Sequence, residues 1–135
     1  MAPKTYTRIV LQERPVGDIV PTTFRKEVVP FDLKPEDAQI LVKVNWLSLD
    51  PAMRGWLRDK RSYLPPVKIG EVMRAIGLGT VVDTSKGSRF RKGDIVQGSF
   101  GEYISGNFTE YSRNTAFVGW TQYAVIGDKQ CTKIV

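Results

Sequence analysis

The chain has 135 residues, 41% of them hydrophobic, and a formal net charge of +6 at pH 7. Its apolar content is high enough to bury a core, which excludes a disordered chain, and its length fits a single domain. The sequence has no histidine and only one cysteine, Cys131. This excludes an internal disulfide, a zinc site built from His and Cys, and Ser-His-Asp or Cys-His catalysis.

Charge and hydropathy along the chain give expectations about location and partners. No apolar run approaches the ~20 residues of a membrane helix, and the N-terminal residues lack the apolar core of a signal peptide. The 20 Lys and Arg residues are scattered, which favours an ordinary basic surface over a phosphate-binding stripe. We therefore expect a cytoplasmic protein that contacts no membrane and no nucleic acid.

The first third of the chain predicts three strands. Residues 5–11 and 24–30 have strand-like patterns, and turn-rich segments follow each of them. Residues 39–46 alternate sharply between apolar and polar side chains, as a half-buried strand does. The side expected to be buried carries Ile40, Val42, Val44 and Trp46.

The pattern changes at Asp50-Pro51. A proline restricts the residue before it to extended conformations and suits the first position of a helix, so Asp50 is the expected N-cap. Residues 52–57 then predict one or two helical turns. On such a helix Arg54 and Arg58 would share a face and could bind a phosphate or carboxylate, although a solvated basic face is the favoured interpretation.

Ser62 and Tyr63 precede two successive prolines, which make the loop rigid. Their hydroxyl groups could face a substrate, and a tyrosine can act as a general acid when its surroundings tune it. The alternative is a tyrosine that simply packs at a turn.

The second half of the chain predicts further short strands. Residues 72–83 are apolar, and a glycine inside a strand, here Gly77 or Gly79, marks a bulge or a close backbone approach. Gly77-Leu78-Gly79 is not a dinucleotide-binding loop, because Val82 stands where the third glycine is needed and no helical pattern follows. Turns at 85–91 and 93–94 lead to a strand at 95–97.

A last strand is predicted at 122–126, followed by a turn at Gly127-Asp128. Trp120 and Tyr123 would lie on opposite faces of this strand, as core and rim residues rather than as a binding platform. Many short strands with glycine turns and little helix indicate a mainly β fold, either a barrel or a sandwich.

Four stretches carry a family resemblance: VKVNWLSLDPAMRGWL, SYLPPVKIGEVMRAIGLGTVV, FRKGDIVQG and GWTQYAVI. In this order, over residues 9–134, they resemble the N-terminal half of the zinc-free medium-chain dehydrogenase/reductases. The branch they resemble most is that of the NADPH-dependent alkenal double-bond reductases, which includes the prostaglandin reductases. The resemblance implies a GroES-like, partly open β-barrel with short helical turns, which forms one N-terminal substrate domain over residues 1–135.

The resemblance also implies an activity. Members of that branch reduce the C=C bond of α,β-unsaturated aldehydes and ketones with hydride from NADPH and without zinc, and the parent enzyme would be a homodimer. The cleft wall would include Asp50, Pro51, Ala52, Met53 and Arg54, with Ser62 and Tyr63 nearby, and would shape the pocket rather than act as a nucleophile. The resemblance assigns no catalytic residue. Many relatives have a tyrosine where this chain has Ala52, so substrate selectivity is expected to differ.

The chain departs from the family pattern in two further places. The family continues into a Rossmann domain, so we expect a fragment of a longer parent that alone neither binds NADPH tightly nor turns over. Residues 102–119 also separate Gly101 from Trp120, which the family joins directly, and predict a loop insertion. A translated intron and a genuine lineage-specific loop are both open explanations of that insertion.

Two other functional classes stay open. A small basic β-barrel could bind nucleic acid, although its aromatic residues are not interleaved with basic ones as a stacking platform requires. A non-catalytic interaction module would instead expose an apolar surface to a partner.

Overall fold

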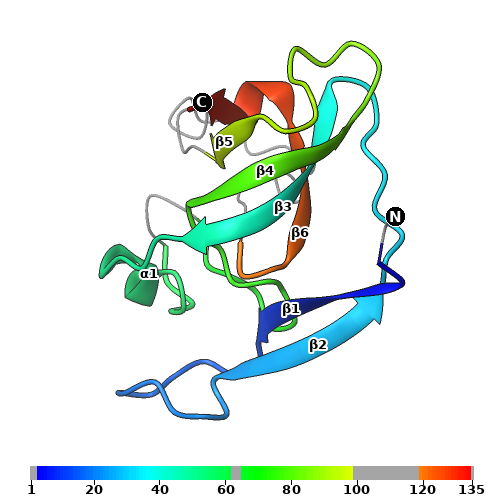
Figure 1. Cartoon of the computed structure of the whole chain (residues 1–135). Coiled ribbons are helices and arrows are strands. Elements are labelled where there is room, and N and C mark those ends of the chain that lie inside the picture. The colour runs from blue at the N-terminus through cyan, green and yellow to red at the C-terminus, as the bar shows by residue number, and fades with distance from the viewer. Residues whose placement is uncertain (1–2, 62–64, 99–118, 135) are drawn as a thin grey trace.

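The computed structural model describes residues 3–61, 65–98 and 119–134, which form two antiparallel sheets (Figure 1). A two-stranded sheet pairs β1 with β2, and a five-stranded sheet has the order β6-β3-β4-β5-β7. The described elements are β1 (Thr5–Leu11), β2 (Phe24–Pro30), β3 (Gln39–Leu47), α1 (Ala52–Gly55), β4 (Gly77–Thr84), β5 (Ile95–Gly98), β6 (Tyr123–Gly127), η3 (Asp128–Gln130) and β7 (Cys131–Lys133). The mainly β prediction is confirmed.

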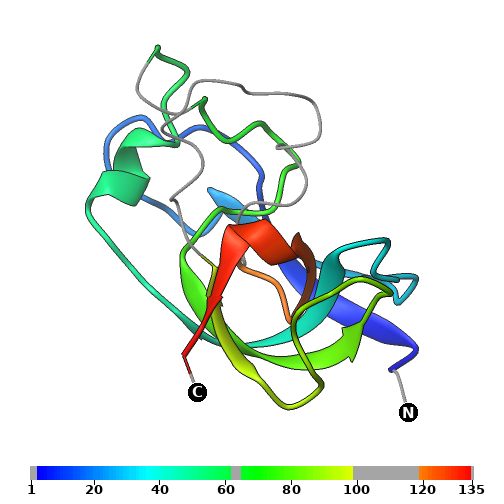
Figure 2. The same ribbon diagram turned by 90° about the horizontal axis from the view of Figure 1, so that it is seen from above.

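The five-stranded sheet curls round its own core, as the view from above shows (Figure 2). Its concave side holds one core cluster, formed by Ile40, Val42, Val81, Phe90, Val96, Ala124, Ile126 and Cys131. A second cluster lies beneath α1 and consists of Leu11, Met53, Trp56, Leu57, Val67, Met73 and Ala75. This second cluster explains why a helix of only four residues persists: Met53 and the residues after it are held by packing rather than by helix length.

Strand β3 contains a β-bulge that the sequence pattern does not reveal. Val44 pairs with Gly79 and Trp46 with Leu78, so Asn45 is an extra residue on the β3 side. The extra residue interrupts the alternation of faces, and Trp46 is 73% exposed. The prediction that Trp46 shares the buried side of the strand was therefore wrong, whereas Ile40 and Val42 are fully buried as expected.

Strand β4 shows why glycine is needed inside it. A Cβ atom at Gly79 would lie 2.2 Å from Val42 Cγ1 and 2.6 Å from the Lys43 carbonyl oxygen. The predicted close backbone approach is confirmed, and Gly77-Leu78-Gly79 continues as regular strand, which no phosphate-binding loop does.

The strand predicted at 72–83 begins later than expected. Residues 72–76 do not belong to β4, and the first two of them run beside β1, where the Met73 N–H donates to the Ile9 carbonyl at 2.9 Å. Val72 also forms an isolated bridge with Val10. This segment therefore helps to attach the small sheet to the rest of the molecule.

The C-terminal segment was only partly predicted. Gly127 ends β6, but a 3₁₀ turn and the short strand β7 follow, and β7 pairs with β5. Asp128 fixes this segment, because its carboxylate accepts hydrogen bonds from Ser88 Oγ at 2.8 Å and from the Arg89 N–H at 2.6 Å. Among the described residues, no helix is long and apolar enough to span a membrane.

Candidate functional site

An open cavity of about 290 Å³ lies where β1, β3 and the segment before β6 meet. Figure 1 shows β1 passing beneath the end of β3 and the start of β6. The lining residues are Thr7, Ile9, Val44, Asn45, Leu47, Trp120, Thr121 and Gln122. Apolar side chains and a few polar groups thus line the same hollow, as is usual for sites that bind small organic molecules.

Residues 119–122 hold the two sheets together at this cavity. On the β1 side, the Ile9 N–H donates to the Trp120 carbonyl at 2.7 Å and the Gln122 N–H donates to the Thr7 carbonyl at 3.0 Å. On the β3 side, the Val44 N–H donates to the Gln122 carbonyl at 2.9 Å. The cavity walls are therefore fixed to each other by backbone hydrogen bonds that one short segment supplies.

The side chain of Gln122 adds a further bond to this frame. The Thr7 N–H donates to Gln122 Oε1 at 2.7 Å. Because a backbone N–H can only donate, this contact settles which end of the carboxamide is oxygen and which is nitrogen. The backbone N–H, backbone carbonyl and side-chain oxygen of Gln122 are all engaged, and its Nε2 group is the part left for a ligand.

Trp120 has two roles that the sequence interpretation treated as alternatives. Its ring packs against Phe24, with the centroids 5.0 Å apart, and against the core cluster beneath α1. The same residue lines the cavity. Its Nε1 is buried and has no acceptor among the residues described. Trp120 is therefore both a core residue and part of the candidate binding surface.

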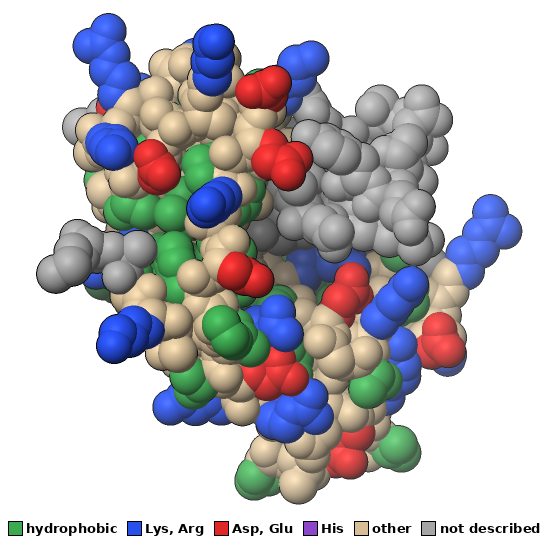
Figure 3. Space-filling view, turned by 90° about the vertical axis from the view of Figure 1, so that its right-hand side faces the viewer, with side chains coloured by type: hydrophobic (Ala, Val, Ile, Leu, Met, Phe, Trp, Pro, Cys, Tyr) green, Lys and Arg blue, Asp and Glu red, His purple; other side chains and the backbone are tan. Residues whose placement is uncertain are grey.

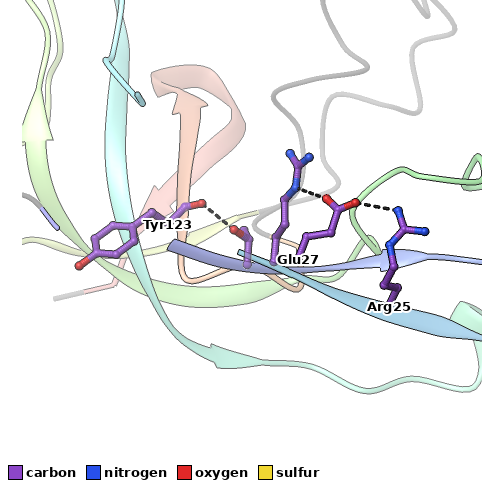
Figure 4. Close-up of polar contacts among 5 residues, drawn as sticks. Arg25, Glu27 and Tyr123 are labelled. Carbon is purple, nitrogen blue, oxygen red and sulfur yellow. Dashed lines mark hydrogen bonds and ion pairs between the residues drawn. The ribbon is translucent and has the colours of Figure 1, made fainter. Parts of the chain in front are cut away.

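Tyr123 matches the expected rim position and does not line the cavity. Its ring meets Phe31 edge to face at 5.1 Å. Figure 4 shows the ring directed away from Glu27 and Arg25, while the Tyr123 carbonyl accepts a hydrogen bond from Thr121 Oγ1 at 2.9 Å. This contact occupies the hydroxyl hydrogen of Thr121 at the cavity.

The Asp-Pro corner lies beyond the cavity rather than inside it. Leu47 lines the cavity, and the chain then runs through Ser48 and Leu49 to Asp50. The Ser48 hydroxyl donates to Asp50 Oδ2 at 2.7 Å, and Pro51 is the N-cap of α1, which has no side-chain cap. The prediction that Asp50 caps the helix was wrong, because its carboxylate is bound to Ser48 instead.

The other predicted cleft-wall residues have different surroundings. Asp50, Pro51 and Ala52 are exposed, and Met53 is buried in the cluster beneath α1. None of the residues at 50–54 lines the cavity. Ser62 and Tyr63 lie outside the described residues, as do residues 102–118 of the predicted insertion. Gly119, the last residue of that insertion, is buried and donates its N–H to the Ala75 carbonyl.

The two arginines of this segment do not share a helical face. Helix α1 ends at Gly55, so Arg58 lies beyond it. Arg54 Nη2 donates to the Gly17 carbonyl in the β1–β2 connection, and Arg58 is exposed. Arg54 is therefore a brace between α1 and the small sheet, and the phosphate hypothesis for this pair gains no support.

Charges on the small sheet are paired across its strands. Glu27 accepts hydrogen bonds from Arg25 at 2.7 Å and from Arg8 at 2.9 Å (Figure 4). These two bonds, that of Arg25 first, hold the pKa of the Glu27 carboxyl below its ordinary value. Figure 3 shows basic and acidic side chains interspersed on one face of the molecule, without a continuous basic stripe.

The described residues offer no group of three or more His, Cys, Asp or Glu side chains that could hold a metal ion. The thiol of Cys131 is buried. Burial, followed by the nearby Asp128 charge, raises the pKa of Cys131 to about 12. The chemistry of the site is therefore that of a shaped apolar hollow with hydrogen-bonding groups.

Comparison with known proteins identifies the family. A family model described as the N-terminal domain of oxidoreductase matches residues 7–109. The chain belongs to this family. It is 42% identical, over 127 residues that make up 94% of the chain, to an NADPH-dependent curcumin reductase of Escherichia coli (strain K12), of which it covers 31%.

Solved structures agree with this assignment. CurA from Vibrio vulnificus is 28% identical, with a TM-score of 0.76, and the match covers 96% of this chain and 32% of that one. The NADPH complex of the same protein is 29% identical, with a TM-score of 0.72 and the same coverage of both chains. The chain thus spans about a third of the length of these relatives. The predicted GroES-like fold and membership of the medium-chain dehydrogenase/reductases are confirmed.

The cavity residues on β1 were not foreseen from the sequence. Thr7 and Ile9 belong to a strand about 35 residues away from β3 along the chain, and no local pattern links them. The Gly-Trp run before β6 was singled out, but its contact with both sheets depends on the fold. Only the apolar character of that run could have pointed to this site.

Proposed function

We propose that this chain supplies one wall of the substrate cleft in an oxidoreductase that reduces the C=C bond of α,β-unsaturated aldehydes or ketones. The relationship to an NADPH-dependent curcumin reductase over 94% of the chain carries this proposal. Curcumin itself contains C=C bonds conjugated to carbonyl groups. The apolar cavity between β1, β3 and residues 120–122 supports the proposal, because it suits a small organic molecule.

The proposed cofactor is NADPH, which would supply the hydride for the whole protein. The residues described here do not fit a nucleotide site. The one Gly-x-Gly sequence among them lies inside β4, and no helix N-terminus follows it. The part of this chain in the reaction is therefore to bind and orient the substrate and to exclude water from one side.

The Asp-Pro corner is proposed as the outer rim of the same cleft. It begins three residues after Leu47, which lines the cavity, and its residues Asp50, Pro51 and Ala52 are exposed, so that they could meet a ligand or a second domain. Met53 and Arg54 would fix the corner from behind, since one is packed in the core and the other is hydrogen-bonded to the β1–β2 connection.

The reaction is proposed to be independent of zinc. The sequence contains no histidine and one cysteine, so it cannot supply the His and Cys ligands that catalytic zinc sites use. The proposed partner is a small enone or enal rather than nucleic acid. Ion pairs such as Lys133 with Asp94, at 3.0 Å, and the arginines on Glu27 neutralise part of the basic surface.

The test is a chimera in which this chain replaces the matching N-terminal part of the E. coli curcumin reductase. We expect the chimera to oxidise NADPH, followed by its absorbance, only when an enone such as curcumin or benzalacetone is added. The E. coli enzyme is the positive control. A chimera that is folded by circular dichroism and binds NADPH, yet oxidises none with any enone, would contradict the proposal.

A non-catalytic interaction module is the second candidate, because one end of β3 is unusually apolar. Trp46, which stands between two residues that line the cavity, is 73% exposed, and Leu49, just after β3, is 74% exposed. If this surface binds a protein partner instead of completing a cleft, substitution of Trp46 by lysine should leave turnover of the chimera unchanged. Under the favoured proposal, the same substitution should reduce turnover, since it charges the edge of the substrate cleft.

A further inference from the structure

Two carboxamide side chains line the cavity, that of Gln122 and that of Asn45, whose Oδ1 accepts the Thr80 hydroxyl. The backbone N–H and carbonyl of Gln122 bind Thr7 and Val44, and its Oε1 accepts the Thr7 N–H. The Nε2 group therefore carries donor hydrogens that this frame does not use. Nearby, the Thr121 hydroxyl hydrogen is already donated to the Tyr123 carbonyl.

The remaining surface of the cavity is mostly apolar. Ile9, Val44, Leu47 and Trp120 contribute its hydrocarbon and indole walls. Burying an apolar body against such walls is favourable, whereas a ligand group with a donor hydrogen would meet no acceptor oxygen at Gln122, because that oxygen is taken by Thr7. The ligand that fits is an apolar molecule with an acceptor oxygen at the Gln122 end.

We propose that Gln122 is a specificity-determining residue whose Nε2 donates to the carbonyl oxygen of an apolar carbonyl compound bound in this cavity. This inference rests on the proposed function, which supplies the enone as the ligand class. It identifies the protein group that hydrogen-bonds to the carbonyl oxygen of the enone. Because three bonds hold Gln122 in place, the donor is preorganised before the ligand arrives. A ketone should therefore bind more tightly than a hydrocarbon of the same shape.

The first test uses the 135-residue chain itself and needs no cofactor. In ¹⁵N-labelled protein, benzalacetone is titrated while the side-chain amide signals of Gln122 are followed by NMR. We expect these signals to shift with ketone and to stay in place with the matching phenyl-substituted butene, which lacks the oxygen. Mass spectrometry checks that no covalent adduct forms; none is expected at Cys131, because that thiol is buried.

The decisive variant is Gln122→Glu. A carboxylate keeps the shape and still accepts the Thr7 N–H, so the fold is retained, but it has no donor for a carbonyl oxygen. Loss of one hydrogen bond predicts about three- to tenfold weaker binding of benzalacetone, with binding of the hydrocarbon unchanged. Gln97→Glu, on β5 and away from the cavity, is the matched control for the added charge and should change neither value.

The outcomes separate this inference from the proposed function. If benzalacetone shifts no cavity signal, or if Gln122→Glu binds ketone as well as the wild-type chain does, the inference is wrong. An active chimera whose Gln122→Glu variant keeps the same KM for benzalacetone would also reject it, while the proposed function would stand. A chimera that binds ketone in a Gln122-dependent manner without oxidising NADPH would reject the proposed function alone.

Discussion

At the scale of single residues, Gly79 in β4 is the position with the strictest requirement for glycine. A methyl group at Gly79 would meet Val42 Cγ1 and the Lys43 backbone oxygen well inside contact distance. The backbone cannot move aside without opening the β3–β4 pairing, which lies in the interior of the five-stranded sheet. A side chain at this position is therefore unfavourable because of the space it needs, whereas at Gly17 and Gly87 glycine suits a positive φ.

We predict that Gly79→Ala destabilises the chain by about 1–3 kcal/mol, the usual cost of inserting a methyl group into a well-packed interior. Gly55→Ala is the matched control, because a Cβ at Gly55 meets nothing within 4 Å, and alanine favours the helix. Urea unfolding followed by fluorescence measures both. Equal stability of the two variants would show that the packing at Gly79 is looser than described.

A second residue-scale prediction concerns Cys131. Burial raises the pKa of its thiol to about 12, so almost no thiolate is present at pH 8. We expect the native chain to react with a thiol reagent such as Ellman's reagent only at the rate at which it opens, and the urea-unfolded chain to react within the mixing time. Rapid labelling of native protein would mean that β7, which carries Cys131, separates readily from β5.

A third residue-scale prediction concerns Ala52, which is exposed at the proposed rim of the cleft. In the chimera, Ala52→Tyr adds an aromatic surface, and an aromatic contact is worth about 0.5–1.5 kcal/mol. We expect roughly two- to tenfold higher kcat/KM for aryl-bearing enones relative to small aliphatic ones. Ala52→Leu controls for bulk alone. Unchanged relative rates across an enone panel would place Ala52 away from the substrate.

At the scale of elements, the small β1–β2 sheet combines exposed charge with a buried edge. Arg8 and Glu27 are directly opposite each other in the register, and Arg25 lies two residues from Glu27 on the same strand. The resulting arginine–glutamate–arginine group lies on the surface, so its contribution at neutral pH is small and is screened by salt. Its effect should appear instead in acid.

The prediction for this sheet follows from the lowered pKa of Glu27. A carboxyl group with a depressed folded-state pKa stabilises the fold above its unfolded pKa, near 4.3, and that contribution is lost as the pH falls through the folded-state value. Glu27→Gln should therefore remove part of the acid dependence of stability below about pH 4.3. Thermal unfolding from pH 7 to pH 2 tests this. Asp18→Asn, a carboxylate in the β1–β2 connection for which no ion pair is described, is the comparison variant.

The elements also show where sequence reasoning succeeds and where it stops. Strands β1 and β2 were predicted over the full ranges observed, because alternation and flanking turn residues are local signals. The exposed Trp46 and the late start of β4 were not, because a bulge and a pairing with β1 depend on partners distant in sequence. Strand β7 has three residues and carries no detectable pattern of its own.

At the scale of the whole molecule, two sheets meet along a seam made by residues 72–73 and 119–122. Both segments bind β1 through the backbone, and the second also binds β3. The cavity lies at this seam, so its dimensions depend on how the sheets are held together. The family resemblance could predict the fold, but the position of the cavity depends on contacts between segments distant in sequence.

For the 135-residue chain as a whole, we predict that NADPH binding is weak. The described residues contain no phosphate-binding loop, because their one Gly-x-Gly sequence lies inside β4. Isothermal titration calorimetry should give no signal at micromolar NADPH. Measurable binding at that level would show that part of a nucleotide site is present in this chain.

Light scattering of the same sample reports whether the exposed Trp46 and Leu49 side chains drive self-association.

The bulge at Asn45 has one more implication, for how this fold can diversify. A single added residue shifts the phase of everything downstream on β3, so that Trp46 points outward although its spacing from Val42 and Val44 assigns it inward. Deleting that residue would exchange the inward-facing and outward-facing side chains of β3 beside the cavity in one step. The rest of the sheet would be unaffected. Insertions and deletions at this position, rather than substitutions, would then be the quickest way for related chains to exchange one ligand preference for another.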